Sequence, residues 1–308
     1  MDTACIIVPV ADIYKDHTFT SEVVTQALMF EVVSILDTYE NWSKIEQWDG
    51  YKGWINNFYL NNDSRYLDNI SRPNDFLYIK QRSLKIYRGS TVDALLPFGV
   101  ALPVSYLGDN EFHIVDPEFD YGENGWSECS GEEEYIVRNP MNTIFTDGTI
   151  GYGEEGDYIN DEYDGDIEEY LRNSIFINCL EVLGTSYKWG GKSSFGFDCS
   201  GLVQTVFKVN NLLIPRDSKD QHELVKNNKI DSLGYGLKCG DLIFFQENKK
   251  ICHVGICLGD FKFIHCSGMV RYNSLDKEDE LFDRKLMDKF VGVFSISEII
   301  KDQLDEPK

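Results

Sequence analysis

The stretch Phe197-Asp198-Cys199-Ser200-Gly201-Leu202-Val203 places a cysteine at the start of a predicted helix. Residues 190–196, just before it, are rich in glycine and serine, as in a loop. Cys199 therefore lies at a helix N-terminus, where free backbone N–H groups and the helix dipole favour an anion, and we expect its thiol to ionise easily. A buried, unreactive thiol is the common alternative. The apolar residues that indicate the helix recur at three- and four-residue spacing and are Leu202, Val203, Val206 and Phe207.

Two of the five histidines lie close together in the C-terminal region of the chain. Residues 252–258 and 261–267 both have strand patterns, and Gly259-Asp260 between them is a turn signal, which predicts a hairpin. In such a hairpin His253 and His265 can come side by side, one ring facing the thiol and the other holding the tautomer of the first. A nucleophile, a base and an orienting group are the parts of a thiol hydrolase.

Several short motifs follow one another in a fixed order. They are Tyr187-Lys188-Trp189-Gly190-Gly191, Asp198-Cys199-Ser200-Gly201, Pro215-Arg216-Asp217-Ser218, Gly240-Asp241-Leu242-Ile243-Phe244-Phe245, His253-Val254-Gly255-Ile256 and Phe263-Ile264-His265. Together they resemble the NlpC-type papain-like cell-wall cysteine peptidases, over residues 167–300. The resemblance implies helices packed on an antiparallel sheet, with Cys199 as nucleophile, His253 as base and His265 as the third polar residue. It also places Tyr187 at the active site, where its hydroxyl could help stabilise an oxyanion; a buried aromatic residue is the alternative.

The N-terminal part of the chain has short strand patterns separated by polar turns, from Cys5 to about Leu60. Closely spaced short strands predict a small barrel. Residues 23–28 and the turn Asp49-Gly50-Tyr51-Lys52-Gly53-Trp54 resemble a bacterial SH3-like domain. Strand patterns after residue 83 and a weaker turn at residues 121–126 predict a diverged second copy.

The expected fold class is therefore α+β, a papain-like NlpC-type catalytic domain preceded by two small SH3-like β-barrels. The acidic run before the catalytic domain is predicted to be a solvated linker. An EF-hand is excluded there, because Gly165 at the sixth loop position puts Leu171 where glutamate is required. The expected domains are an SH3-like domain at 1–65, a connector at 66–82, a second SH3-like domain at 83–146, the linker at 147–166 and the peptidase domain at 167–308.

Composition limits the partners of the chain. Its 308 residues suffice for two or three domains. The 29 basic and 52 acidic residues give a formal charge of −23, which argues against nucleic acid and anionic membranes as partners. No stretch is apolar enough to span a bilayer. We expect a monomer that needs no cofactor and no metal, since no pair of potential zinc ligands has a recognisable spacing.

The compartment is predicted from cysteines and the N-terminus. The eight cysteines are scattered and form no Cys-x-x-Cys pair, as expected for reduced thiols. Residues 1–5 lack the basic region of a signal peptide. We therefore expect a cytoplasmic protein; a periplasmic or secreted protein whose signal peptide has been removed would show the same N-terminus.

The expected reaction is acyl transfer, because an activated thiol, an imidazole base and oxyanion donors attack an amide and form an acyl-enzyme. SH3-like domains ahead of an NlpC-type domain resemble γ-D-glutamyl-L-diamino-acid endopeptidases. That resemblance implies cleavage between D-Glu and meso-diaminopimelate or L-Lys in peptidoglycan stem peptides with a free N-terminal L-Ala, in murein peptide recycling.

A free substrate amine needs carboxylate and hydroxyl partners. By resemblance, those in the catalytic domain are Asp198, Ser200 and Ser218. We expect the first SH3-like domain and its connector to close the pocket through Glu46 and Tyr78, although either could be an ordinary surface or packing residue. For Arg216 two roles stay open, an ion pair with a carboxylate of the protein or a contact with a substrate carboxylate.

Other functions stay open. The same catalytic core could serve a cell-wall hydrolase, an amidase or an acyltransferase. A binding protein that tethers an idle domain to the cell wall is a further alternative, against which the complete set of Cys199, His253 and His265 argues.

Overall fold

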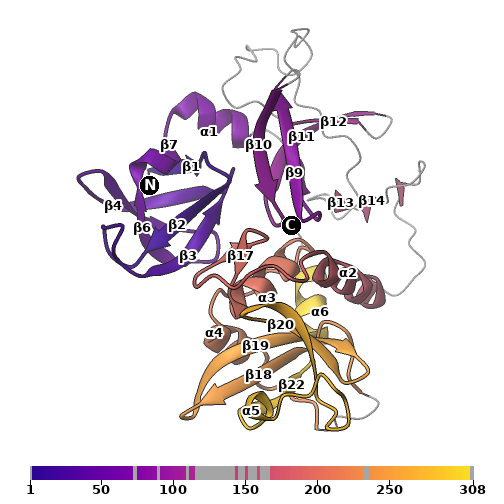
Figure 1. Cartoon of the computed structure of the whole chain (residues 1–308). Coiled ribbons are helices and arrows are strands. Elements are labelled where there is room, and N and C mark those ends of the chain that lie inside the picture. Colours follow the sequence, from indigo (N-terminus) through magenta and orange to yellow (C-terminus); the bar gives the residue numbers. More distant parts are fainter. Residues whose placement is uncertain are drawn as a thin grey trace. The chain divides into compact units, whose positions relative to one another are not determined.

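The computed structural model describes residues 2–71, 75–88, 91–108, 111–114, 143–144, 150–151, 158–159, 167–231 and 236–305 (Figure 1). The chain divides into two compact units, Met1–Glu162 and Tyr163–Lys308. Within the described residues, no helix has both the length and the apolar composition needed to cross a membrane.

The first unit begins with an antiparallel seven-stranded sheet in the order β3-β2-β6-β5-β4-β1-β7. Alternate residues of its strands face one apolar core, which includes Ile13, Ile45 and Ile55. Short strands recur through residues 3–61, as the pattern from Cys5 to about Leu60 predicts. The elements are β1 (Thr3–Ile6), β2 (Val10–Tyr14), β3 (Val23–Leu28), β4 (Val32–Tyr39), β5 (Trp42–Glu46), β6 (Lys52–Asn56), the 3₁₀ helix η1 (Asn57–Tyr59) and β7 (Leu60–Asn61).

The next segment differs from the expected connector at residues 66–82. It contains most of the helix α1 (Ser64–Ser71) and the strand β8 (Asp75–Tyr78), which pairs with β11 (Ala101–Gly108). Tyr66 and Leu77 are buried in one core with Leu28 of the first sheet, so the segment is an integral part of the first unit.

Among the described residues 83–114 of the predicted second SH3-like domain, the strands belong to two small sheets. The hairpin of β9 (Ser83–Arg88) and β10 (Thr91–Pro97) forms one, and β11 lies between β8 and β12 (Glu111–Ile114) in the other. The predicted turn at residues 121–126 and most of the predicted acidic linker lie outside the described residues. The short strands β13 (Thr143–Ile144), β14 (Ile150–Gly151) and β15 (Tyr158–Ile159) form a further sheet.

The second unit is an antiparallel five-stranded sheet in the order β21-β20-β19-β18-β22, with helices packed on it (Figure 1). The run Leu242–Phe245 is fully buried within β18, between two neighbouring strands, as its continuous apolar pattern predicts. Helix α3 contacts β19 and β20, which carry the two histidines. The elements are α2 (Ile167–Glu181), β16 (Lys192–Ser193), β17 (Gly196–Phe197), α3 (Cys199–Lys208), α4 (Ser218–Val225), β18 (Leu242–Glu247), β19 (Lys250–Gly259), β20 (Lys262–Ser267), β21 (Met269–Ser274), α5 (Arg284–Met287), β22 (Phe290–Phe294) and α6 (Ser297–Asp305).

Candidate active site

Cys199 is the first residue of α3, as predicted. The carboxylate of Asp198 caps the helix by accepting a hydrogen bond of 2.7 Å from the backbone N–H of Gly201. Gly201 packs against the preceding loop so closely that a Cβ atom there would lie 2.1 Å from the carbonyl oxygen of Gly191. The capped helix and the tight loop together fix the position of the thiol.

The ionisation of Cys199 differs from the expectation. Burial, and secondly the carboxylate of Asp198, raise the pKa of the thiol to about 11. The backbone N–H groups of Val254 and Ser200 act in the opposite direction but are weaker. The helix N-terminus therefore does not produce a resting thiolate here, and the thiol needs a base that removes its proton during attack.

The two histidines form a hydrogen-bonded pair. His253 lies on β19 and His265 on β20, and the His253 Nε2 atom is 2.7 Å from His265 Nδ1. Gly255 is the residue directly opposite His265 in the sheet, and a Cβ atom there would lie 3.2 Å from that of His265. The predicted hairpin and the pairing of the two rings are thus present.

The chain of hydrogen bonds continues to Asn273 on β21, which the sequence interpretation missed. Asn273 Nδ2 donates to the carbonyl oxygen of Leu281 at 2.7 Å, which turns Oδ1 toward His265 Nε2 at 2.8 Å. In a neutral His265, Nε2 must therefore carry the proton and Nδ1 must accept one from His253 Nε2. This leaves Nδ1 of His253 as the unprotonated, basic atom. One carboxamide sets both tautomers.

Both histidines are neutral at pH 7. Burial, and secondly the neighbouring His265, lower the pKa of His253 to about 3. Burial likewise lowers the pKa of His265 to about 4, although the hydrogen bond with Asn273 acts in the opposite direction. His253 is therefore in the form that can accept a proton from a thiol.

Tyr187 lies near the nucleophile, as the resemblance implied. Burial raises the pKa of its hydroxyl to about 12, and the nearby thiol of Cys199 and carboxylate of Asp198 add to this effect. The hydroxyl therefore keeps its proton and is available as a hydrogen-bond donor.

Two roles stayed open for Arg216, an ion pair with a protein carboxylate and a contact with a substrate carboxylate. The structure shows the ion pair, with Asp198. The Nη1 and Nη2 atoms of Arg216 lie 3.0 and 2.7 Å from the two carboxylate oxygens of Asp198, and Nη1 also donates to Ser200 Oγ at 2.9 Å. Asp198 accepts further hydrogen bonds from the backbone N–H groups of Gly190 and Gly201. Arg216 and Asp198 are buried. Asp198 and Ser200 thus help to position the nucleophile, and their expected contact with a substrate ammonium stays a prediction.

The remaining candidates lie on separate elements. Ser218 is the first residue of α4 and is half-buried. In the first unit, Glu46 on β5 forms an ion pair of 3.4 Å with Lys52, and Tyr78 ends β8 half-buried. Their contact with a substrate stays a prediction.

Asn273 could have been found from the hairpin of β20 and β21. Gly268, with a φ of 71°, forms the turn, and the register pairs Arg271 with His265. Asn273 is two residues further on the same strand, so its side chain lies on the same face as that of His265. The sequence signal for Asn273 was therefore a polar residue in the strand after Gly268, on the face of the sheet that carries His265.

A thiol at a helix N-terminus, a neutral imidazole base and a polar chain that holds its tautomer define a thiol hydrolase on a helix-and-sheet core. The comparisons agree. Residues 184–287 match the NlpC/P60 family, and residues 9–61 match the bacterial SH3 domain. The second unit thus contains an NlpC/P60 cysteine peptidase domain, preceded in the chain by a bacterial SH3 domain.

Three similar proteins extend this result. A γ-D-glutamyl-L-lysine dipeptidyl-peptidase of Bacillus cereus is 25% identical over 270 residues, which cover 80% of this chain and 68% of the relative. The protein of the same name from Bacillus subtilis is 41% identical over 104 residues, which cover 33% of this chain and 32% of the relative. The crystal structure of an NlpC/P60 family protein from Bacillus cereus shares the fold, with a TM-score of 0.67, 20% identity and coverage of 94% of this chain and 98% of that chain.

Proposed function

We propose that this protein hydrolyses the γ-D-glutamyl-L-diamino acid bond of peptidoglycan stem peptides that have a free N-terminal L-Ala, in murein peptide recycling. The diamino acid would be meso-diaminopimelate or L-Lys. The observation that carries the chemistry is the chain of hydrogen bonds from Asn273 through His265 to His253, whose chain neighbour Val254 donates its backbone N–H to the sulfur of Cys199. The names of the two Bacillus relatives support the choice of bond, and one of these alignments extends over 80% of this chain.

The reaction begins when Nδ1 of His253 takes the proton of the Cys199 thiol and the sulfur attacks the γ-carbonyl carbon of D-Glu. The oxyanion that forms accepts hydrogen bonds from the backbone N–H of Cys199 and the hydroxyl of Tyr187. The C–N bond then breaks, and His253 gives its proton to the leaving amine of the diamino acid.

The second half of the reaction hydrolyses the thioester. His253 takes a proton from water while the water oxygen attacks the acyl carbon, and the C–S bond breaks as the thiol regains its proton. The products are L-Ala-D-Glu and a peptide that begins with the diamino acid. Throughout, His265 and Asn273 hold the ring of His253 in the tautomer whose Nδ1 is the base.

We further propose that Glu46, Tyr78 and Ser218 bind the substrate ammonium. A carboxylate and hydroxyls are the groups that stabilise an ammonium removed from water. Asp198 and Ser200, which flank the nucleophile and both contact Arg216, are further candidates of the catalytic domain for this role. A peptide with a free amine comes from released stem peptides rather than from intact wall, and a cytoplasmic site of action is part of the proposal.

Mass spectrometry of the products tests this function. The substrates are L-Ala-γ-D-Glu-diaminopimelate, the corresponding L-Lys tripeptide, their N-acetylated forms and purified cell wall. Release of L-Ala-D-Glu from free tripeptides alone is the expected result. Efficient cleavage of purified wall would favour a cell-wall hydrolase, and products from a different bond would favour an amidase or acyltransferase on the same core.

A further inference from the structure

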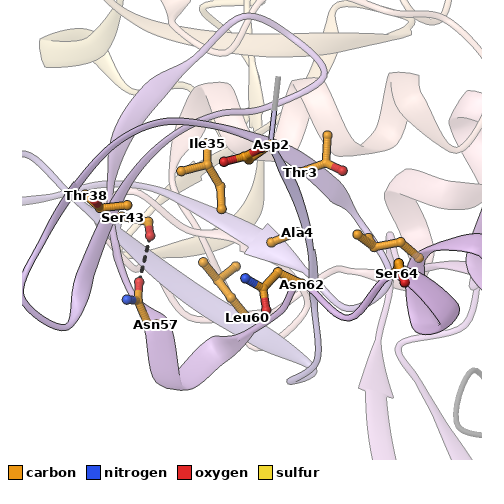
Figure 2. Close-up of a pocket in the computed structure, with 11 residues that line it drawn as sticks. Asp2, Thr3, Ala4, Ile35, Thr38, Ser43, Asn57, Leu60, Asn62 and Ser64 are labelled. Atoms are coloured by element: carbon orange, nitrogen blue, oxygen red, sulfur yellow. Dashed lines mark hydrogen bonds between the residues drawn. The ribbon is translucent and has the colours of Figure 1, made fainter.

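The first unit contains a cavity of about 660 Å³ whose eleven lining residues all come from residues 2–67 (Figure 2). This volume lies within the usual range of small-ligand sites. Figure 2 shows the labelled side chains around one hollow, with Ser43 and Asn57 on one side and Ser64 on the other. No residue of the hydrolytic mechanism lines it.

Hydrogen-bonding groups of the cavity are available to a ligand. Ser43 Oγ donates to Asn57 Oδ1 at 2.7 Å, which leaves the two N–H bonds of Asn57 Nδ2 for other acceptors. Within the described part of the chain, the carboxamide of Asn62 and the hydroxyls of Thr3 and Thr38 have no protein partner. The cavity thus offers both donors and acceptors, next to the apolar side chain of Leu60.

The charge of the lining restricts the ligand. Asp2 is the one acidic lining residue, and none of the eleven is basic. The backbone of Asp2, just before β1, is held against β4, because its carbonyl oxygen accepts a hydrogen bond of 2.8 Å from the N–H of Ile35. A negatively charged ligand would find no counter-charge, whereas an ammonium group would find the carboxylate of Asp2.

The uncharged side chains that line the cavity favour a peptide rather than a sugar as the ligand. Carboxamide and hydroxyl side chains match the alternating N–H and C=O groups of a peptide backbone. None of the lining residues is aromatic, so the apolar face of a sugar ring would have no ring to stack on.

We propose that this cavity is a second binding site, which takes a short peptide with a free amino group. The ammonium lies at Asp2, and the peptide amides lie against Asn57 and Asn62. The site is independent of the proposed hydrolysis, because binding needs no catalytic residue.

The test uses the full chain with Cys199→Ala, which removes hydrolysis, and the probe L-alanyl-glycinamide, which has an ammonium and no carboxylate. Two-dimensional ¹H–¹⁵N NMR follows the amide signals of Thr3, Asn57 and Asn62 during the titration. Saturable shifts of these signals are expected. N-acetyl-L-alanyl-glycinamide should bind at least about tenfold more weakly, since a hydrogen bond to a charged group is lost.

Asn62→Leu provides the matched variant. Asn62 is exposed, so we expect the substitution to leave the fold intact. It removes the N–H donors and the C=O acceptor of this carboxamide, and the affinity for the peptide should therefore fall about tenfold. Thr20→Leu, at another exposed polar residue of the first unit that does not line the cavity, should leave the affinity unchanged. Absence of saturable shifts at these three signals, equal affinity for the acetylated probe, or equal affinity in Asn62→Leu would overturn the proposal. N-acetylglucosamine that shifts the same signals as strongly as the peptide would also overturn it.

Discussion

Asn273 is the residue on which the orientation of the base depends. Its Nδ2 is held by the carbonyl of Leu281, so Oδ1 accepts from His265, and this fixes Nδ1 of His253 as the basic atom. The tautomers of both rings therefore depend on a residue outside the set of Cys199, His253 and His265.

Asn273→Leu therefore should lower kcat by at least about tenfold, because a misoriented base loses part of the rate that proton transfer contributes. KM should change little, since Asn273 contacts no substrate in the proposed mechanism. Asn273→Asp keeps an acceptor for His265 and should retain more activity than Asn273→Leu. Steady-state kinetics of both variants test this, and a rise in KM at unchanged kcat would argue against an orienting role.

The ionisation of the pair predicts the pH profile. Burial lowers the pKa of His253 from 6.5 to about 3, and that of His265 to about 4. A lowered pKa keeps the basic form of His253 as pH falls through 6.5, and activity is lost only when a proton binds at lower pH. The acid limb of kcat/KM should thus lie below pH 6.5. An acid limb centred at or above pH 6.5 would show that the pair is not held neutral by burial.

At the scale of elements, the N-terminus of α3 depends on the close approach of Gly201 to the carbonyl of Gly191. Gly201→Ala would place a Cβ atom 2.1 Å from that oxygen, so the helix or the loop must shift. We expect the free energy of unfolding to fall by about 1–3 kcal/mol and the melting temperature to fall with it. Activity should be lost as well, because the helix positions Cys199. Lys219→Ala, at an exposed position of α4, is the control and should melt like the native protein. An unchanged melting temperature in Gly201→Ala would mean that this contact is not as tight as described.

The same elements show what sequence patterns can predict. The helix after Cys199 and the hairpin that carries the histidines follow from local periodicity and a turn signal, and both were predicted correctly. The contact of Arg216 with Asp198 joins residues from different elements and was left with two alternatives. The ionisation of Cys199 was predicted in the wrong direction, because local position suggests the helix dipole while burial comes from the whole fold. The shared core that includes Tyr66 and Leu77 was missed for the same reason.

At the scale of the whole molecule, the proposal assigns the recognition of the substrate amine partly to the first unit. Glu46→Ala and Tyr78→Phe should each lower kcat/KM for the free tripeptide at least about tenfold, since each removes a partner of a charged group. Their effect on the N-acetylated peptide should be much smaller. Asp37→Ala, at an exposed carboxylate of the first sheet, is the control and should leave both rates unchanged. Equal losses on free and acetylated peptides would remove Glu46 and Tyr78 from the binding site.

The most direct test of the account is the rate at which Cys199→Ala releases L-Ala-D-Glu from the free tripeptide, measured beside the native protein and with circular dichroism to verify the fold. Because the acyl-enzyme forms on this sulfur, the rate should fall by at least about 10⁴-fold while the spectrum stays unchanged. A folded Cys199→Ala protein that still hydrolyses the tripeptide at a comparable rate would contradict the assignment of Cys199 as the nucleophile.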